Sequence, residues 1–395
     1  MQISSIDKGR GRMALIVGHC AGMVDLIGLP LWVGVLIETY QFDPQQAGGL
    51  ATLFLAGIVV ASVLLAPRFH RVSKRLVATT GFSVAAVGFF IASTTRDPIM
   101  LIALHAVCGI ATGAGLSVTH GTMSQGERPH RLMAIAGVAM GVFAVIFMAF
   151  VPRLLIDHGG PTLFVVFGAV MAFAALIMLS AFPTQTQNAD TSELHLDQLG
   201  SMPRAVWFGL AGFTLVCLAH AMSNSFLERV GVDSGFPREH IANALLAMAI
   251  VSVLPGLLAA YLEHRVKART VLFATPILHA IMVAVLMTST SFPAYVIAMI
   301  SLPGLMIFMH TFVFGAIANL DRSGRALAAF PASIMVGTAA GPVVGGTLVK
   351  SLGYPAVGVG ALCICVFVVM CFMRLTKHSK SVASVNESLQ ASSLQ

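Results

Sequence analysis

Short polar segments divide this sequence into twelve apolar runs, each long enough to cross a lipid bilayer. The hydrocarbon core of a bilayer is about 30 Å thick and needs about 20 apolar residues in a helix. Lipid offers no hydrogen-bond partner to an open strand, so each run must be α-helical. The sequence therefore predicts an all-α membrane protein, with helices at residues 13–37, 46–66, 76–94, 98–119, 132–154, 162–182, 204–227, 241–262, 271–289, 293–318, 326–349 and 355–374.

Composition agrees with this class and argues against several kinds of function. Hydrophobic residues make up 57% of the chain and charged residues 10%, whereas soluble proteins carry about 25% charged residues. The net charge of +7 is spread over short segments between runs, so no nucleic-acid surface is expected. The six cysteines have no metal-ligand or disulfide-framework spacing, and no G-x-x-x-x-G-K-[ST] loop is present. We expect no metal, cofactor or nucleotide, and no enzyme.

The positions of the basic residues predict the orientation in the membrane. With a cytoplasmic N-terminus, eighteen Lys and Arg residues fall in inner segments and five in outer ones. An even number of helices returns the C-terminus to the cytoplasm. We therefore expect a multi-pass protein of a bacterial inner membrane with both termini inside, surrounded by lipid and monomeric.

An internal repeat divides the chain into two halves. The segment "HRVSKR" at 70–75 returns as "HRVKAR" at 264–269, and the same offset relates Gly159 to Gly353. Six helices per half give parallel repeats, related by a pseudo-two-fold axis along the membrane normal. The predicted units are a six-helix bundle at 1–182, a cytoplasmic linker at 183–203, a six-helix bundle at 204–375 and a disordered cytoplasmic tail at 376–395.

Two parallel six-helix halves with basic loops after helices 2 and 8 resemble the major facilitator superfamily (MFS) over essentially the whole chain. The family's loop after helix 2 usually reads G-x-x-x-D-R-x-G-R-R, and "VLLAPRFHRVSKR" keeps Arg68 and the later bases but has Pro67 in place of the acid. The resemblance implies secondary transport by alternating access. It also implies gating by these loops, for which we select Arg68, Arg71, Glu263 and Arg265.

The segment "GTAAGPVVGG" at 337–346 matches the G-x-x-x-G-P-x-x-G-G pattern that family antiporters carry on helix 5. Here it lies on helix 11, while helix 5 has no Gly-Pro pair. The motif therefore does not identify an antiporter. We interpret it as a stripe of small residues for close helix packing.

Asp25 is the one acid deep within an apolar run. It lies thirteen residues after Arg12, about 20 Å along a helix and so near the middle of the membrane. An ionised Asp there costs about 2.5–3.5 kcal/mol of insertion free energy, which neighbouring apolar residues offset. A carboxyl that alternates between a sealed site and a wet cavity can carry a proton. We therefore predict that Asp25 couples proton movement to transport and lines the substrate cavity, with a structural hydrogen-bonding role as the alternative.

The other candidate cavity residues are histidines and one asparagine. The repeat offset maps Asp25 next to His220, and Asn224 follows one turn later on the same helix. His105 and His310 join this set because helices 4 and 10 usually line the family's cavity. His19 and His279 rank lower, and interhelical hydrogen bonding is the alternative role for each of these side chains.

The resulting prediction is a proton-coupled secondary transporter of a small organic molecule. No Lys or Arg lies deep in a run, so a neutral, amphipathic or cationic substrate is favoured over a polyanion, and export fits slightly better than import. The alternative is a proton symporter that imports a monovalent organic or aromatic acid. A non-transporting membrane receptor remains a minor alternative.

Overall fold

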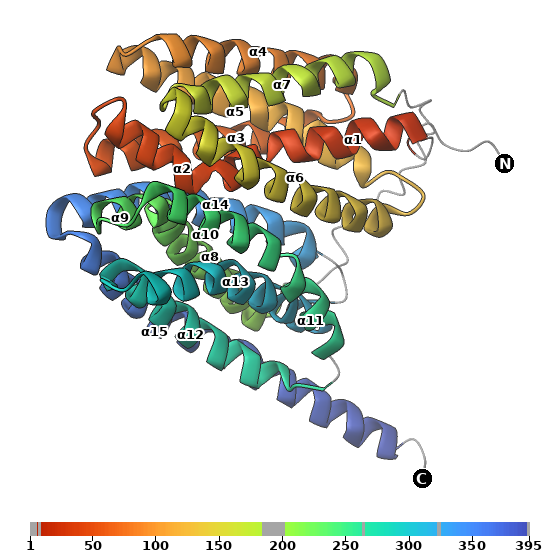
Figure 1. Cartoon of the computed structure of the whole chain (residues 1–395). Helices are drawn as coiled ribbons and strands as arrows, with labels where there is room; N and C mark the ends of the chain where they lie inside the picture. The colour runs from red at the N-terminus through yellow and green to blue at the C-terminus, as the bar shows by residue number, and fades with distance from the viewer. Residues whose placement is uncertain (1–5, 7–8, 184–201, 263–264, 322–324, 393–395) are drawn as a thin grey trace.

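The structure is a computed structural model that describes residue 6 and residues 9–183, 202–262, 265–321 and 325–392. Long α-helices account for almost all of them (Figure 1). In chain order they are α1 (Gly9–Gly22), α2 (Val24–Glu38), α3 (Pro44–Leu65), α4 (Lys74–Thr94), α5 (Pro98–Met123), α6 (Pro129–His158), α7 (Thr162–Ala181), α8 (Arg204–Asn224), α9 (Leu227–Asp233), α10 (Arg238–Val251), α11 (Leu254–Leu262), α12 (Ala268–Thr288), α13 (Phe292–Leu320), α14 (Arg325–Leu352) and α15 (Tyr354–Ser392), with a short 3-10 turn at Ala66–Arg68.

Within the described residues these helices make twelve candidate membrane spans, as the sequence predicts. Three spans are built from two helices each. The first span contains α1 and α2, and the seventh contains α8 and α9. The eighth contains α10 and the first residues of α11. The first span breaks at Met23, whose backbone (φ −118°, ψ 15°) is not helical. Asp25 therefore lies in the first turn of a separate helix instead of the middle of a continuous one.

Local sequence signals explain several helix ends. Asp43 caps α3 through the Gln46 N–H, and Gln46 returns a bond to the Asp43 N–H, which completes a capping box. Gly159 follows α6 with φ +84°, and Gly353 follows α14 with φ +80°. Only glycine adopts this conformation without strain. The two positions related by the sequence repeat thus end the fifth and eleventh membrane helices in the same way.

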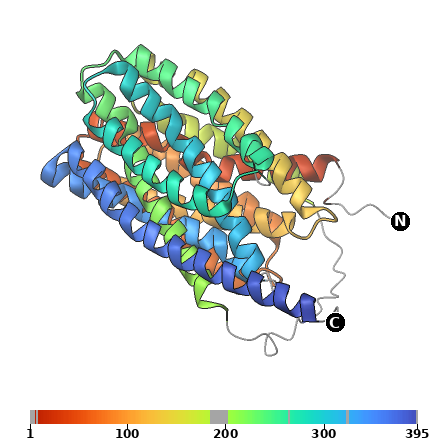
Figure 2. The same ribbon diagram turned by 90° about the horizontal axis from the view of Figure 1, so that it is seen from below.

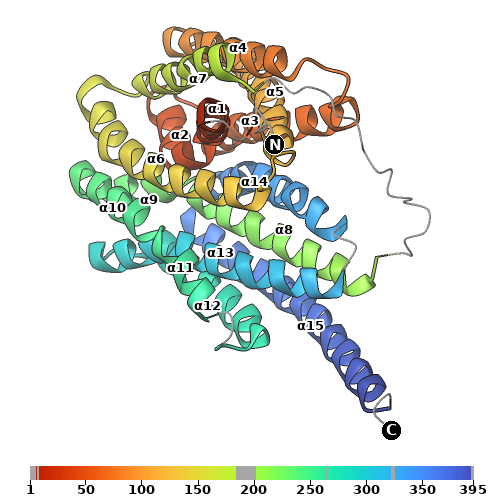
Figure 3. The ribbon, with the colours of Figure 1, turned by 90° about the vertical axis from the view of Figure 1, so that its right-hand side faces the viewer.

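The helices form two six-helix bundles, with α1 to α7 in the first and α8 to α15 in the second (Figure 1). The chain termini lie at one end of the molecule (Figures 1 and 2). We call the opposite end, which carries Glu38 and Asp43, the distal end. Contacts between the bundles join α3 to α14, α6 to α10 and α2 to α9, and the first of these neighbours can be followed in Figure 3.

The glycine-rich segment of α14 packs on two sides. A Cβ added at Gly337 or Gly341 would collide with the backbone of α8 in the same bundle. A Cβ added at Gly346 would overlap the Pro44 carbonyl of α3, and one added at Gly48 of α3 would overlap the Pro342 carbonyl of α14. The predicted role in close helix packing is confirmed, and it includes contact between the bundles at the distal end.

Within the segment 376–395, which the sequence assigns to the cytoplasmic tail, α15 continues as helix to Ser392. Residues 375–392 contain neither glycine nor proline, so nothing in the sequence ends this helix. Most of the predicted linker at 183–203 lies outside the described residues.

Candidate functional site

Asp25 is buried at the break in the first membrane helix, with 2% of its surface exposed. Its Oδ2 atom has no hydrogen-bond partner among the described residues. No described Lys or Arg forms an ion pair with it. A buried carboxylate is normally paired or neutral. The site therefore fits a protonated carboxyl better than an ionised one.

The packing around the break places a second unpartnered group at a similar depth. Gly18 and Gly22 of α1 face Thr119 and Leu116 of α5, which runs in the opposite direction. Thr112 lies one turn beyond Leu116 towards the distal end, as Asp25 lies beyond Gly22. The Thr112 hydroxyl also has no partner among the described residues. The interface of the first and fourth membrane helices thus holds two unsatisfied polar groups.

His105 occupies the interior of the first bundle. Its Nε2 accepts a hydrogen bond from Trp32 Nε1 at 3.2 Å, and its Nδ1 lies 2.7 Å from the Leu101 carbonyl. The rings of Phe54 and Phe167 lie 5.0 and 5.2 Å from that of Trp32. Both ring nitrogens of His105 therefore have partners within a packed aromatic cluster.

Each bundle contains a pair of histidines in hydrogen-bond contact. His19 Nδ1 of α1 lies 2.8 Å from His120 Nε2 of α5, and His220 Nδ1 of α8 lies 3.2 Å from His279 Nε2 of α12. One nitrogen of each pair must donate and the other accept, so the pair is satisfied when both rings are neutral. If both rings of a pair were protonated, their two positive charges would repel each other within a buried site.

The remaining predicted cavity residues lie in the second bundle. Asn224 ends α8 and is partly buried. His310 of α13 is partly buried against the rings of Phe213 and Phe330, at 5.4 and 5.3 Å between centroids. The structure brings His220 and Asn224 onto one helix and leaves His310 on another.

The predicted gating residues make local contacts. Arg68 donates to the Leu64 carbonyl at 2.8 Å, and the Arg265 guanidinium bonds and stacks on Tyr261, 4.2 Å from the ring centroid. Arg71 is exposed. Glu263 lies outside the described residues.

Ion pairs between the bundles gather at the distal end instead. Glu38 of α2 accepts Arg238 of α10 at 2.6 Å and lies 3.7 Å from Arg229 of α9. Lys350 of α14 binds Asp43 at 2.9 Å. Partial burial acts to raise the pKa of Asp43, but the Gln46 N–H and Lys350 outweigh it and hold this pKa below its usual value. These pairs fasten the bundles together at this end.

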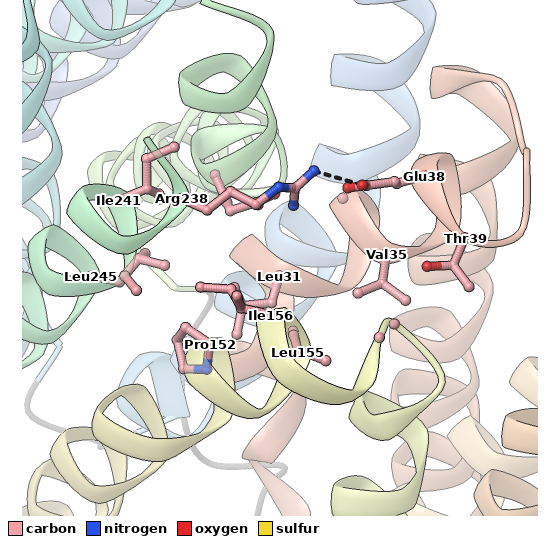
Figure 4. A pocket seen from close by; sticks show the side chains of 15 residues that line it. Leu31, Val35, Glu38, Thr39, Pro152, Leu155, Ile156, Arg238, Ile241 and Leu245 are labelled. Carbon is pink, nitrogen blue, oxygen red and sulfur yellow. Dashed lines mark hydrogen bonds and ion pairs between the residues drawn. The ribbon is translucent and has the colours of Figure 1, made fainter. Parts of the chain in front are cut away.

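A cavity of about 290 Å³ lies beneath the Glu38–Arg238 pair (Figure 4). Its walls come from both bundles, with Leu31 and Val35 of α2 facing Leu245 of α10. A second cavity of about 310 Å³ lies between α6 and α10, where Arg153 donates to Asn243 at 3.3 Å. Asp25, His105, His220, Asn224 and His310 do not line either cavity.

Sequence reasoning missed His120, Glu228 and the importance of His279. The predicted fourth helix ended at residue 119, but α5 continues to Met123 and so includes His120. The predicted seventh helix ended at residue 227, but α9 continues to Asp233. His279 ranked low because helix 9 was expected to face lipid, yet its side chain is 3% exposed against His220.

Comparison with known proteins agrees with this architecture. The fold is similar to an inward-facing, unoccupied bacterial homologue of the human lysosomal transporter Spinster, with a TM-score of 0.73 and 12% identity over 95% of this chain and 98% of that one. It is also similar to the nucleoside transporter NupG, with a TM-score of 0.70 and 14% identity over 93% and 98% of the two chains. No curated relative matches the sequence. The family model of the Major Facilitator Superfamily matches residues 14–321, so the chain belongs to this superfamily and is a transporter rather than an enzyme.

Proposed function

We propose that this protein is a proton-coupled secondary transporter of a small organic molecule, with Asp25 as the residue that carries the proton. The observation that supports this most is the unpartnered Oδ2 of a carboxyl with 2% exposure at a helix break. A sealed site favours the protonated acid, whereas a wet cavity favours the carboxylate. In this proposal, α2 moves relative to α1 about the non-helical backbone at Met23, and this motion changes the exposure of Asp25 to water.

The distribution of charge supports a neutral, amphipathic or cationic substrate. Every described Lys and Arg lies near the end of a candidate membrane span or outside the spans. Phosphates and dicarboxylates generally need a fixed cation within a dry cavity. Asp25 instead suits a cation that exchanges with a proton, which corresponds to export. Both termini in the cytoplasm of a bacterial cell and a monomeric state complete the proposal.

A monovalent organic or aromatic acid carried with a proton is the second candidate. The His220–His279 pair favours it, because uptake of one proton would turn this pair into a buried cation beside Asn224. The two candidates predict opposite directions of substrate movement in the same proton gradient.

A ligand must first be found by a thermal-shift screen of the purified protein against organic cations, aromatic acids, sugars and amino acids. Adding the identified ligand to sealed vesicles that contain the protein should then change the internal pH. An acid that enters with a proton should acidify the lumen, and a cation that exchanges for one should make it more alkaline. Ligand binding without any pH change would contradict proton coupling, and binding without ligand movement would support a receptor.

A further inference from the structure

Glu228 is an acid at the contact between the two bundles that the mechanism above does not use. It lies in the first turn of α9 and lines the cavity of about 290 Å³ at the distal end together with Glu38 and Arg238. Its side chain reaches across to the other bundle, because a Cβ added at Gly34 of α2 would collide with Glu228 Oε2. The absence of a side chain at Gly34 therefore creates the space that this carboxyl occupies.

The charges around Glu228 do not balance if it is ionised. Arg229 pairs with Asp233 at 2.6 Å and Arg238 pairs with Glu38 at 2.6 Å, so each guanidinium already holds a carboxylate. Asp233 also accepts the Tyr354 hydroxyl at 2.5 Å. Glu228 forms no ion pair or hydrogen bond with any residue that the structure describes. Two cations thus face three acids, and one bound proton makes the cluster neutral.

The remaining polar groups near Glu228 offer no further cation. On α13, the Tyr295 hydroxyl packs against Gly231 and donates to the Leu227 carbonyl at 2.8 Å. On α10, Glu239 belongs to the wall of the second cavity, and His240 packs against Phe292. On α6, which forms another wall of this cavity, Arg153 faces the second cavity and donates to Asn243. The two guanidinium groups beside Glu228 are therefore Arg229 and Arg238, and both are already paired.

We propose that Glu228 is a second proton-binding site, and that closing the distal end requires this proton. When α2 and α9 separate, the carboxyl returns to water and is stable as a carboxylate. When they meet, it is pressed against the α2 backbone at Gly34 without a cation of its own, so the neutral acid is favoured. The claim that Glu228 binds a proton on closure stands on this geometry alone. The claim that transport uses this proton rests on the proposed proton coupling.

The test measures the distance between the bundles at the distal end as a function of pH. Spin labels on Thr94→Cys, at the end of α4, and Thr290→Cys, after α12, mark exposed positions on the two bundles in a background without the natural cysteines. A closing step that binds one proton changes the ratio of closed to open molecules by up to about tenfold per pH unit. We expect short distances at pH 5 and a shift to long distances by pH 8.

Glu228→Gln should keep the short distance over this whole pH range, because the amide cannot ionise. Glu239→Gln, a matched change of an exposed acid on α10, should respond like the parent protein. Asp25→Asn should also keep the pH response, which separates this proton site from the one in the proposed function. Gly34→Ala fills the space that the Glu228 carboxyl occupies when α2 and α9 meet, so it should disfavour the closed form and move the midpoint of closure to lower pH.

Several results would overturn the proposal. One is a label-to-label distance in the parent protein that does not depend on pH. The others are a normal pH response in Glu228→Gln, or a lost pH response in Glu239→Gln. A response abolished by Asp25→Asn would assign the switch to that residue instead. An unchanged midpoint in Gly34→Ala would contradict the role of the contact between Gly34 and Glu228.

Discussion

Replacing Gly48 by alanine should oppose closure of the distal end. Gly48 of α3 touches the Pro342 carbonyl of α14, which is backbone and cannot rotate away from an added methyl group. Overpacking of this kind costs about 1–3 kcal/mol. Because 1.4 kcal/mol corresponds to a factor of ten, the ratio of closed to open molecules should fall by about 5- to 150-fold.

Gly49 provides the matched control for this prediction. It is the next residue of the same helix, and a Cβ added there meets nothing within 4 Å. Both substitutions gain about the same helix propensity, up to about 1 kcal/mol, so comparing the two variants cancels this contribution. The assay is the distance between spin labels at the distal ends of α4 and α12. If Gly48→Ala and Gly49→Ala give the same distance distribution, the contact between α3 and α14 does not control closure.

Three further predictions concern charge and packing. Glu38→Gln removes the acceptor of two solvent-accessible ion pairs worth about 0.2–1 kcal/mol each, so the same distance measurement should show a ratio of closed to open molecules reduced by about 2- to 30-fold. No change in this ratio would show that these pairs do not hold the bundles together. The pKa of Asp43 is lowered in the closed form, so its pairing with Lys350 contributes fully above the usual Asp range and is lost only as the pH falls through the lowered pKa. Lys350→Met should therefore lower the ratio of closed to open molecules about 1.5- to 5-fold, by the same factor at pH 6 and pH 8. A factor that differs between these pH values would contradict the lowered pKa of Asp43. Trp32→Phe deletes a buried hydrogen bond worth about 1 kcal/mol and should lower Tm in detergent, whereas a loss no larger than that of exposed Trp207→Phe would argue against the aromatic cluster as a stabilising core.

The sequence predicts the architecture well because lipid imposes strong constraints on it. Run length and the absence of charge define each membrane helix, and the offset between Gly159 and Gly353 identifies positions that end helices in both bundles. The acid at Asp25 is recognisable because ionisable groups are rare in such runs. These signals are local, or repeat at a fixed distance along the chain.

The contacts of the candidate site depend on details that local signals do not contain. Gly22 directly precedes the break at Met23, but glycines recur along this span at positions 18, 28 and 34, so a glycine alone does not identify where the helix breaks. The histidine pairs join α1 to α5 and α8 to α12, and such pairing depends on how each helix is rotated about its axis. The sequence predicts that the seventh membrane helix ends at residue 227, just before Glu228. Polar residues near the membrane surface hide the fact that helical structure continues through α9 to Asp233.

The most direct test of the account compares two transport modes in vesicles that contain Asp25→Asn. With the ligand found by the thermal-shift screen, exchange of labelled for unlabelled ligand needs no net proton movement, whereas accumulation in a pH gradient does. The account predicts that Asp25→Asn keeps ligand exchange at close to the parent rate and loses accumulation driven by the gradient. Accumulation by this variant equal to that of the parent protein would contradict the claim that Asp25 carries the proton.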